Sequence, residues 1–287
     1  MSNIGLAAPL VPTQHNDIYE ATSPAGSVLV TGSGRGVGRA TALAFAQAGA
    51  KKVILTSRSQ NELEEVKDAI EKLGKSTEVK VITANLTQEK DVDRLFEEAG
   101  EVDVLINNAG YLERCALIRD SDPADWIRTQ EINMNGTYLA TRAFLRAAHA
   151  KGTVNDSSKK LAIINTSSIG SAWTTPGLSG YQSNKTMINR FTEFIHFEEP
   201  SVRTFAIHPG GVMTKLATEG MPSDLHYILC DTPELSAGLS LWLATQDDAD
   251  FLRGRYDVDE LVAKKAEIVS KDLLWTRVVG QEQIMPK

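Results

Sequence analysis

Short apolar runs alternate with amphipathic stretches along most of the chain. Runs rich in β-branched residues predict buried strands, and they cover residues 27–31, 51–57, 78–85, 102–107, 161–167 and 202–209. Between them, apolar residues at three- and four-residue spacing predict helices, as at Leu63, Val66, Ile70 and Leu73 before Gly74. Repeated strand–helix–strand units predict an α/β fold. It is a single-domain, Rossmann-like, doubly wound parallel sheet with helices on both faces and ligands at the carboxyl ends of its strands.

The chain is expected to divide into a short arm and one large domain. Residues 1–26 carry Pro12, Pro24 and Gly26 among polar residues, which favours an extended N-terminal arm. Residues 27–287 form the predicted domain, because single α/β domains often reach this length. The N-terminus lacks the basic start and apolar core of a signal peptide. No stretch of about 18 apolar residues predicts a membrane span.

Charge and cysteine content exclude several classes of function. The 30 Lys and Arg against 37 Asp and Glu give a net charge of −7, and no basic run offers a nucleic-acid footprint. Cys115 and Cys230 lack zinc-site spacing, so no metal is expected. Two thiols in a reducing compartment are the favoured interpretation, with one disulfide as the alternative. A cytoplasmic protein is therefore expected.

The stretch TGSGRGVG at residues 31–38 predicts a phosphate-binding turn. It departs from the G-x-G-x-x-G pattern, which would need glycine at Val37 or Arg39. It nevertheless follows a predicted strand and precedes a helix over about residues 37–48. Glycines at a helix N-terminus let the backbone approach a pyrophosphate closely. An ordinary tight turn is the alternative interpretation.

The residues after the second strand bear on the choice of cofactor. NAD binding favours an acid about 20 residues after the glycines, where this chain has Thr56, Ser57, Arg58 and Ser59. Arg58 can pair with a 2′-phosphate, and Arg35 in the glycine turn adds a second positive charge. Although a lone arginine is usually a solvated surface residue, the two together favour NADP(H).

Tyr181 and Lys185 are four residues apart on a predicted helix and share one face. A neighbouring ammonium lowers a phenol pKa, so this pair could donate a proton to a carbonyl oxygen. The spacing alone occurs often by chance.

Several motifs in a fixed order give the pair more weight, and with them the chain resembles the classical short-chain dehydrogenase/reductase family. The motifs are TGxxxGxG at Thr31, Gly32, Gly36 and Gly38, NNAG at 107–110, Asn133 with Gly136, Ser168, YxxxK at Tyr181 and Lys185, and PGxVxT at 209–214. Gly34 has no part in the family spacing. The match spans residues 28 to about 214. The two chain ends bear a weaker similarity to fungal members that act in secondary metabolism.

The resemblance implies a role for each motif. Tyr181 would be the general acid in reduction, and Ser168 would hold the substrate oxygen, with Ser167 as its alternative. Lys185 would bind the nicotinamide ribose and lower the tyrosine pKa, and Asn133 would anchor a proton-relay water. With the arginines, the cofactor-binding set is Gly32, Ser33, Arg35, Gly36, Val37, Gly38, Arg58, Asn85, Leu86, Asn108, Ala109, Gly110, Tyr181, Lys185, Pro209, Gly210, Val212 and Thr214.

The chain departs from the family in a few places. Asn85 stands where many relatives carry Asp, and Asn184 where Ser often precedes the catalytic lysine. His196 and His208 are interpreted as structural, since the family uses neither.

Residues 212–233 lie where the family has its variable substrate lid. An apolar pocket is expected from Tyr111, Trp173, Met213, Leu216, Met221, Leu225, Tyr227 and Ile228, although for any one of them packing of the lid against the body is the better explanation. Together they favour a bulky, largely apolar substrate. The leading hypothesis is an NADPH-dependent carbonyl reductase that forms a homodimer or homotetramer. The alternatives are a redox-neutral isomerisation, epimerisation or cyclisation with bound cofactor, and a nucleotide-sensing binding protein.

Overall fold

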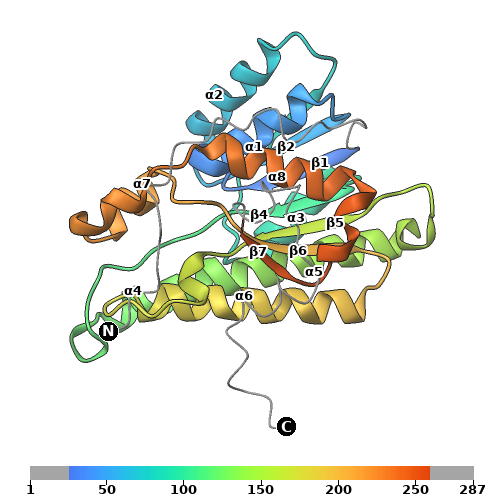
Figure 1. Cartoon of the computed structure of the whole chain (residues 1–287). Helices are drawn as coiled ribbons and strands as arrows, with labels where there is room; N and C mark the ends of the chain where they lie inside the picture. The colour runs from blue at the N-terminus through green and yellow to red at the C-terminus, as the bar shows by residue number, and fades with distance from the viewer. Residues whose placement is uncertain (1–25, 259–287) are drawn as a thin grey trace.

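The computed structural model describes residues 26–258, which form a parallel sheet between two layers of helices (Figure 1). The strands are β1 (Ser27–Thr31), β2 (Lys52–Thr56), β3 (Glu78–Val81), β4 (Val104–Asn107), β5 (Ala162–Thr166), β6 (Arg203–His208) and β7 (Tyr256–Val258). The order across the sheet is β3-β2-β1-β4-β5-β6-β7. The Rossmann-like prediction is confirmed. Apart from Gly26, the expected N-terminal arm lies outside the described residues, as does the chain beyond Val258.

Eight α-helices are described, and they cover both faces of the sheet. They are α1 (Gly36–Gln47), α2 (Gln60–Glu71), α3 (Glu89–Ala99), α4 (Pro123–Gln130), α5 (Gly136–Ala150), α6 (Ser179–Glu198), α7 (Lys215–Gly220) and α8 (Pro233–Thr245). Figure 1 shows α1, α2 and α8 above the sheet and α5 and α6 below it.

Alternation along each strand divides the interior into two apolar cores. On β1, Val28 and Val30 join the core under α1, α2 and α8, whereas Leu29 joins the core that α3 and α5 complete. The same alternation holds along β2, β4 and β5, as the two-residue period of a strand requires. Because both faces are buried, the strands are continuously apolar, which is why the sequence pattern located them.

The boundaries of the predicted elements differ from the structure in a few places. The strand expected over residues 78–85 ends at Val81, and the one expected over 102–107 begins at Val104. β7 was not predicted, since Tyr256–Val258 is too short to carry a periodic pattern. Its three residues pair in parallel with Ala206–His208.

A polar bridge crosses the sheet at the carboxyl end of β4. The Asn107 amide donates to Asn165 Oδ1 at 2.9 Å and to Thr141 Oγ1 at 3.0 Å. Asn165 on β5 in turn donates to Thr192 Oγ1 on α6 at 2.9 Å. Because buried amides need such partners, the bridge fixes α5 and α6 against the edge of the sheet where the strand order reverses.

Candidate active site

The glycine turn connects β1 to α1 at this carboxyl edge. Gly32 and Gly36 adopt φ values of +65° and +55°, which side chains rarely tolerate. At Gly38 a Cβ would lie 2.4 Å from the Gly32 carbonyl oxygen. The N-cap residue of α1, Arg35, makes no side-chain capping bond, and the first turn holds no acid. The turn therefore suits the phosphates of a dinucleotide.

Thr31 and Asn108 hold the glycine turn against β4. Thr31 Oγ1 accepts hydrogen bonds from the backbone N–H groups of Asn108 and Ala109 at 2.9 and 3.0 Å. The Asn108 amide donates to the carbonyl oxygens of Thr31 at 2.9 Å and Gly32 at 3.3 Å. The NNAG motif thus holds the glycine turn in place and, through Asn107, stabilises the sheet beneath it.

The two arginines beside the turn have different surroundings. Arg35 Nη1 lies 3.3 Å from Glu62 Oε1 on α2, and both side chains are substantially exposed. Arg58 is exposed and makes no ion pair within residues 26–258. A Cβ on Gly34 would lie 2.9 Å from Glu62 Cβ. Gly34 therefore has a packing role that the motif spacing did not suggest. Glu62 is an acid near this turn that the sequence analysis did not predict, because it lies beyond the residues that end β2.

Asn85 and Leu86 follow β3 on the same edge. Asn85 Oδ1 accepts from the N–H and the hydroxyl of Thr87, at 3.2 and 3.0 Å, which shapes the turn before α3. A Cβ on Gly136 would lie 3.2 Å from Leu86 Cβ, so Leu86 packs closely against the start of α5. Asn85 and Leu86 therefore shape and pack the backbone at the carboxyl edge of the sheet.

Tyr181, Lys185 and Ser168 come together at the start of α6. The Lys185 ammonium nitrogen lies 5.3 Å from the centre of the Tyr181 ring and donates to the Thr166 carbonyl oxygen at 2.6 Å. Ser168 lies close enough to the Tyr181 hydroxyl to affect its pKa, and its side-chain oxygen accepts from the Gly170 N–H at 3.0 Å. Ser167 is buried instead, and its hydroxyl donates to the Lys185 carbonyl oxygen at 3.1 Å. Ser168 is therefore the serine that faces the tyrosine.

The ionisation of this cluster differs from the expectation. Burial raises the pKa of Tyr181 to about 12, the nearby Ser168 side chain acts to lower it, and the charge of Glu113 raises it further. The expected lowering of that pKa by Lys185 is wrong for this structure. Burial lowers the pKa of Lys185 itself to about 8. At neutral pH the phenol is protonated, as an unshifted tyrosine also is, and its raised pKa makes it a weaker acid than free tyrosine.

Asn133 lies in a π-helical turn, Glu131–Asn135, between α4 and α5. Its side-chain oxygen accepts from the Tyr111 N–H at 2.8 Å, and its amide donates to the Tyr111 carbonyl oxygen at 2.7 Å. The Asn133 carbonyl oxygen accepts from the Thr137 hydroxyl at 2.7 Å. Such π turns often occur at functional sites. Here the side chain holds the segment after NNAG through one donor and one acceptor bond.

Three other polar residues, two of them near the cluster, have structural contacts. His208 Nδ1 accepts from the Ile169 N–H at 3.1 Å, and burial lowers the pKa of His208 to about 4, so its ring stays neutral at pH 7. The Asn184 amide donates to the Gly180 carbonyl oxygen at 2.7 Å. His196 is distant in the fold and packs against Gly254.

The segment after β6 covers the glycine turn. A Cβ on Gly36 would lie 3.1 Å from Thr214 Cγ2, and one on Gly110 would lie 3.6 Å from Leu216 Cδ1. Asp231 Oδ2 accepts from the Gly211 N–H at 2.6 Å, which fixes the turn after Pro209. The segment that carries Val212 and Thr214 therefore lies beside the cofactor cradle.

The expected pocket residues are only partly enclosed. Trp173, Met213 and Tyr227 are 46%, 58% and 78% exposed. Leu216, Met221, Leu225 and Ile228 are half-buried. Tyr111 donates its hydroxyl to Asp125 Oδ1 at 2.6 Å and lies under Arg128. The apolar side chains of the lid thus form an open surface.

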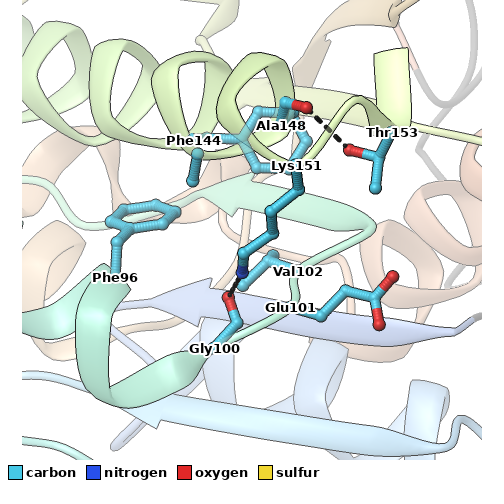
Figure 2. Close-up of a pocket in the computed structure, with 9 residues that line it drawn as sticks. Phe96, Gly100, Glu101, Val102, Phe144, Ala148, Lys151 and Thr153 are labelled. Carbon is cyan, nitrogen blue, oxygen red and sulfur yellow. Dashed lines mark hydrogen bonds between the residues drawn. The ribbon is translucent and has the colours of Figure 1, made fainter. Parts of the chain in front are cut away.

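A separate pocket lies at the opposite, amino edge of the sheet. Figure 2 shows it between α3 and α5, where Lys151 Nζ donates to the Gly100 carbonyl oxygen at 2.9 Å. Its lining is Phe96, Gly100, Glu101, Val102, Phe144, Ala147, Ala148, Lys151 and Thr153. None of these residues belongs to the cluster around Tyr181.

Residues 26–258 lack three further features. No grouping of three or more His, Cys, Asp or Glu side chains there is arranged to hold a metal ion. No helix in that range has the length and apolar character needed to cross a membrane. Cys115 and Cys230 do not form the disulfide considered as an alternative.

Comparison with known proteins gives consistent matches. The family model described as short chain dehydrogenase matches residues 27–223. A Monascus purpureus protein named short chain dehydrogenase mpl6 is 39% identical, over 92% of this chain and 94% of that protein. The short chain dehydrogenase pigC of Monascus ruber is 33% identical, over 93% of each chain. The crystal structure of a Brucella melitensis 3-ketoacyl-(acyl-carrier-protein) reductase complexed with NADH matches with a TM-score of 0.72 and 27% identity, over 82% of this chain and 97% of that one.

Proposed function

Because the chain belongs to the short-chain dehydrogenase family, we propose that it is an NADPH-dependent reductase of a bulky, largely apolar ketone. The family comprises oxidoreductases that use a nicotinamide cofactor. The observation that carries the proposal is the arrangement of the Tyr181 phenol beside Ser168 and Lys185 at the carboxyl edge of the sheet.

The proposed mechanism gives each side chain one task. When bound, the nicotinamide supplies a hydride to the carbonyl carbon of the substrate. Ser168 donates a hydrogen bond to the carbonyl oxygen, and Tyr181 transfers its hydroxyl proton to that oxygen, giving a secondary alcohol. Lys185 holds the cofactor ribose and stabilises the phenolate left on Tyr181, which then takes a proton from solvent. Asn133, in its π turn, would hold the relay water for that return.

The preference for NADPH rests on charge at the adenosine end. Arg35 and Arg58 are both exposed near the turn and can form charge-assisted hydrogen bonds with a 2′-phosphate. Glu62 opposes this preference, because it already pairs with Arg35. Arg58 has no such competitor among the described residues, so the net balance favours the additional phosphate.

The substrate class follows from the exposed lid. Met213 and Tyr227 on the lid, and Trp173 outside it, present apolar surface to solvent, and a ligand that covers them gains from its desolvation. Together with the fungal relatives, this supports a secondary-metabolite ketone, such as a polyketide or terpenoid, as the natural substrate.

One assay tests the proposed function. The protein is incubated with NADPH and, separately, α-tetralone, decalone and a long-chain β-keto ester, while cofactor absorbance and product identity are both followed. Equimolar alcohol formation and NADPH loss support the proposal. Product without NADPH loss would indicate the redox-neutral alternative, and cofactor binding without product would indicate a binding protein.

We also propose that the protein is a homo-oligomer formed through α5 and α6. Met187, Phe194 and Phe197 lie along one stripe of α6 and are 44%, 52% and 80% exposed. Tyr138 on α5 packs edge-on against Phe191 beside them. Such a continuous apolar surface is typical of an interface.

The assembly is expected to dissociate when a charge is placed on this stripe. Phe197→Glu should lower the mass measured by light scattering to that of the monomer, because burying an unpaired carboxylate in the interface is costly. Tyr227→Glu is the control, since Tyr227 is equally exposed but lies on the lid. A wild-type protein that is already monomeric would refute the proposal.

A further inference from the structure

Glu113 is a buried acid in the connection between β4 and α4, and the proposed mechanism does not use it. Its side chain is only 4% exposed. Its Oε1 atom accepts a hydrogen bond at 2.9 Å from the backbone N–H of Tyr181, which is 68 positions away in the sequence. No motif pointed to this residue.

The contact completes the N-terminus of α6. The first backbone N–H groups of a helix have no partner within it, and the N-cap residue Leu178 has no side chain that can accept one. Glu113 supplies the acceptor from a distant part of the chain. A carboxylate is also favoured at this end of a helix by the helix dipole.

Gly180 gives the carboxylate room to approach the helix. A Cβ at this position would lie 3.0 Å from Glu113 Oε1 and 3.1 Å from Trp126 Cδ1. The Trp126 ring nitrogen donates to Ser179 Oγ at 3.2 Å, so α4 holds the same helical turn from the other side.

Glu113 lies in the segment 111–114, which is anchored by hydrogen bonds at both of its ends. The backbone of Tyr111 is bonded twice to the Asn133 side chain. The Arg114 N–H donates to Asp125 Oδ2 at 2.8 Å, and the Tyr111 hydroxyl donates to the other oxygen of the same carboxylate. The segment therefore links Asn133 rigidly to Tyr181.

We propose that Glu113 is a positioning residue for ketone reduction, which holds the first turn of α6, and with it the Tyr181 hydroxyl, against the substrate carbonyl. This inference rests on the proposed function. In this proposal the segment 111–114 fixes the distance between Asn133 and Tyr181. These two residues take part in the proposed reaction and lie on different helical segments.

The charge of Glu113 also acts on Tyr181. Its Oε2 atom is buried and has no hydrogen-bond partner within residues 26–258. The charge raises the pKa of Tyr181, in addition to the larger effect of burial, and so makes the phenol a weaker acid. The role of Glu113 therefore rests on the contacts that position the first turn of α6 and not on its charge.

Two variants test the role against a matched control. Glu113→Ala removes the acceptor, whereas Glu113→Gln keeps an oxygen that can accept the Tyr181 N–H. The control is Asp103→Asn, because Asp103 is also a buried acid that accepts a backbone N–H, from Ser27 at 2.7 Å, at the far edge of the sheet. The full-length variants are assayed with NADPH and the ketone that wild type reduces fastest. Melting temperature and KM for NADPH are recorded for each.

Glu113→Ala should lower kcat by about tenfold to 100-fold while KM for NADPH stays within about twofold, since small displacements of a reacting group are costly. Glu113→Gln should restore most of the rate, and Asp103→Asn should lower the melting temperature without lowering kcat. In the Tyr181→Phe background, Glu113→Ala should have no further effect on kcat.

The positioning role is refuted if Glu113→Ala keeps the wild-type kcat, if Glu113→Gln is as slow as Glu113→Ala, or if Asp103→Asn loses kcat equally. The proposed function fails separately, if wild type reduces no ketone or Tyr181→Phe keeps its rate.

Discussion

Replacing Tyr181 by phenylalanine is expected to lower kcat for ketone reduction by about 10²- to 10⁴-fold, the usual contribution of a general acid. The variant keeps the ring beside Lys185 and loses only the hydroxyl that lies close to Ser168. KM for NADPH should therefore change little. Steady-state kinetics on the ketone with the highest wild-type rate, with alcohol formation followed directly, give the measurement.

Tyr138→Phe is the matched control for this experiment. Tyr138, on α5, is a tyrosine outside the cluster that is 45% exposed and whose ring packs against Phe191. Its kcat should equal that of wild type. If Tyr181→Phe turned over at the wild-type rate, another group would have to donate the proton and the assignment would be wrong.

The combined variant Arg35→Ala/Arg58→Ala should lose on the order of 10²-fold or more in kcat/KM for NADPH. Each charge-assisted hydrogen bond contributes about 1.5–3 kcal/mol, and every 1.4 kcal/mol is a factor of ten. The value for NADH should fall much less, because NADH has no 2′-phosphate for the guanidinium groups to hold. The ratio of the two kcat/KM values is the quantity to compare.

Two single variants separate this effect from a general loss of positive charge. Arg39→Ala removes an exposed arginine from α1 and should leave the ratio unchanged. Glu62→Gln frees Arg35 from its ion pair and should raise the preference for NADPH. Equal losses with both cofactors in the double variant would refute the assignment of the arginines.

The sheet was predictable because the central strands β1, β2, β4 and β5 are buried on both faces and therefore mostly apolar. The glycine turn was predictable because positive φ at Gly32 and Gly36 leaves little choice of residue. β7 could not be predicted, since three residues at the sheet edge carry no period. Helix α2 was expected from the spacing of Leu63, Val66 and Ile70, all of which are buried.

The site was only partly predictable because its polar contacts join distant positions. YxxxK gave the pair, but the pKa of the Tyr181 phenol depends on burial and on Glu113, which no local pattern connects to it. Glu62 was missed for the same reason: it lies on the first turn of α2, just beyond the positions where an acid is usually sought. The π turn at Asn133 likewise depends on the backbone of Tyr111, 22 positions earlier.

If ketones bind at the lid as proposed, its open surface limits how finely the protein can discriminate among them. Trp173 and Met213 offer surface area and few directional contacts, so affinity should increase with the apolar area that a ligand covers. A pocket of this kind distinguishes two congeners that differ by one methylene by only about ten- to 200-fold. A family of related ketones would then compete for the same surface. Which alcohol accumulates would be decided by the relative concentrations of those ketones in the cell.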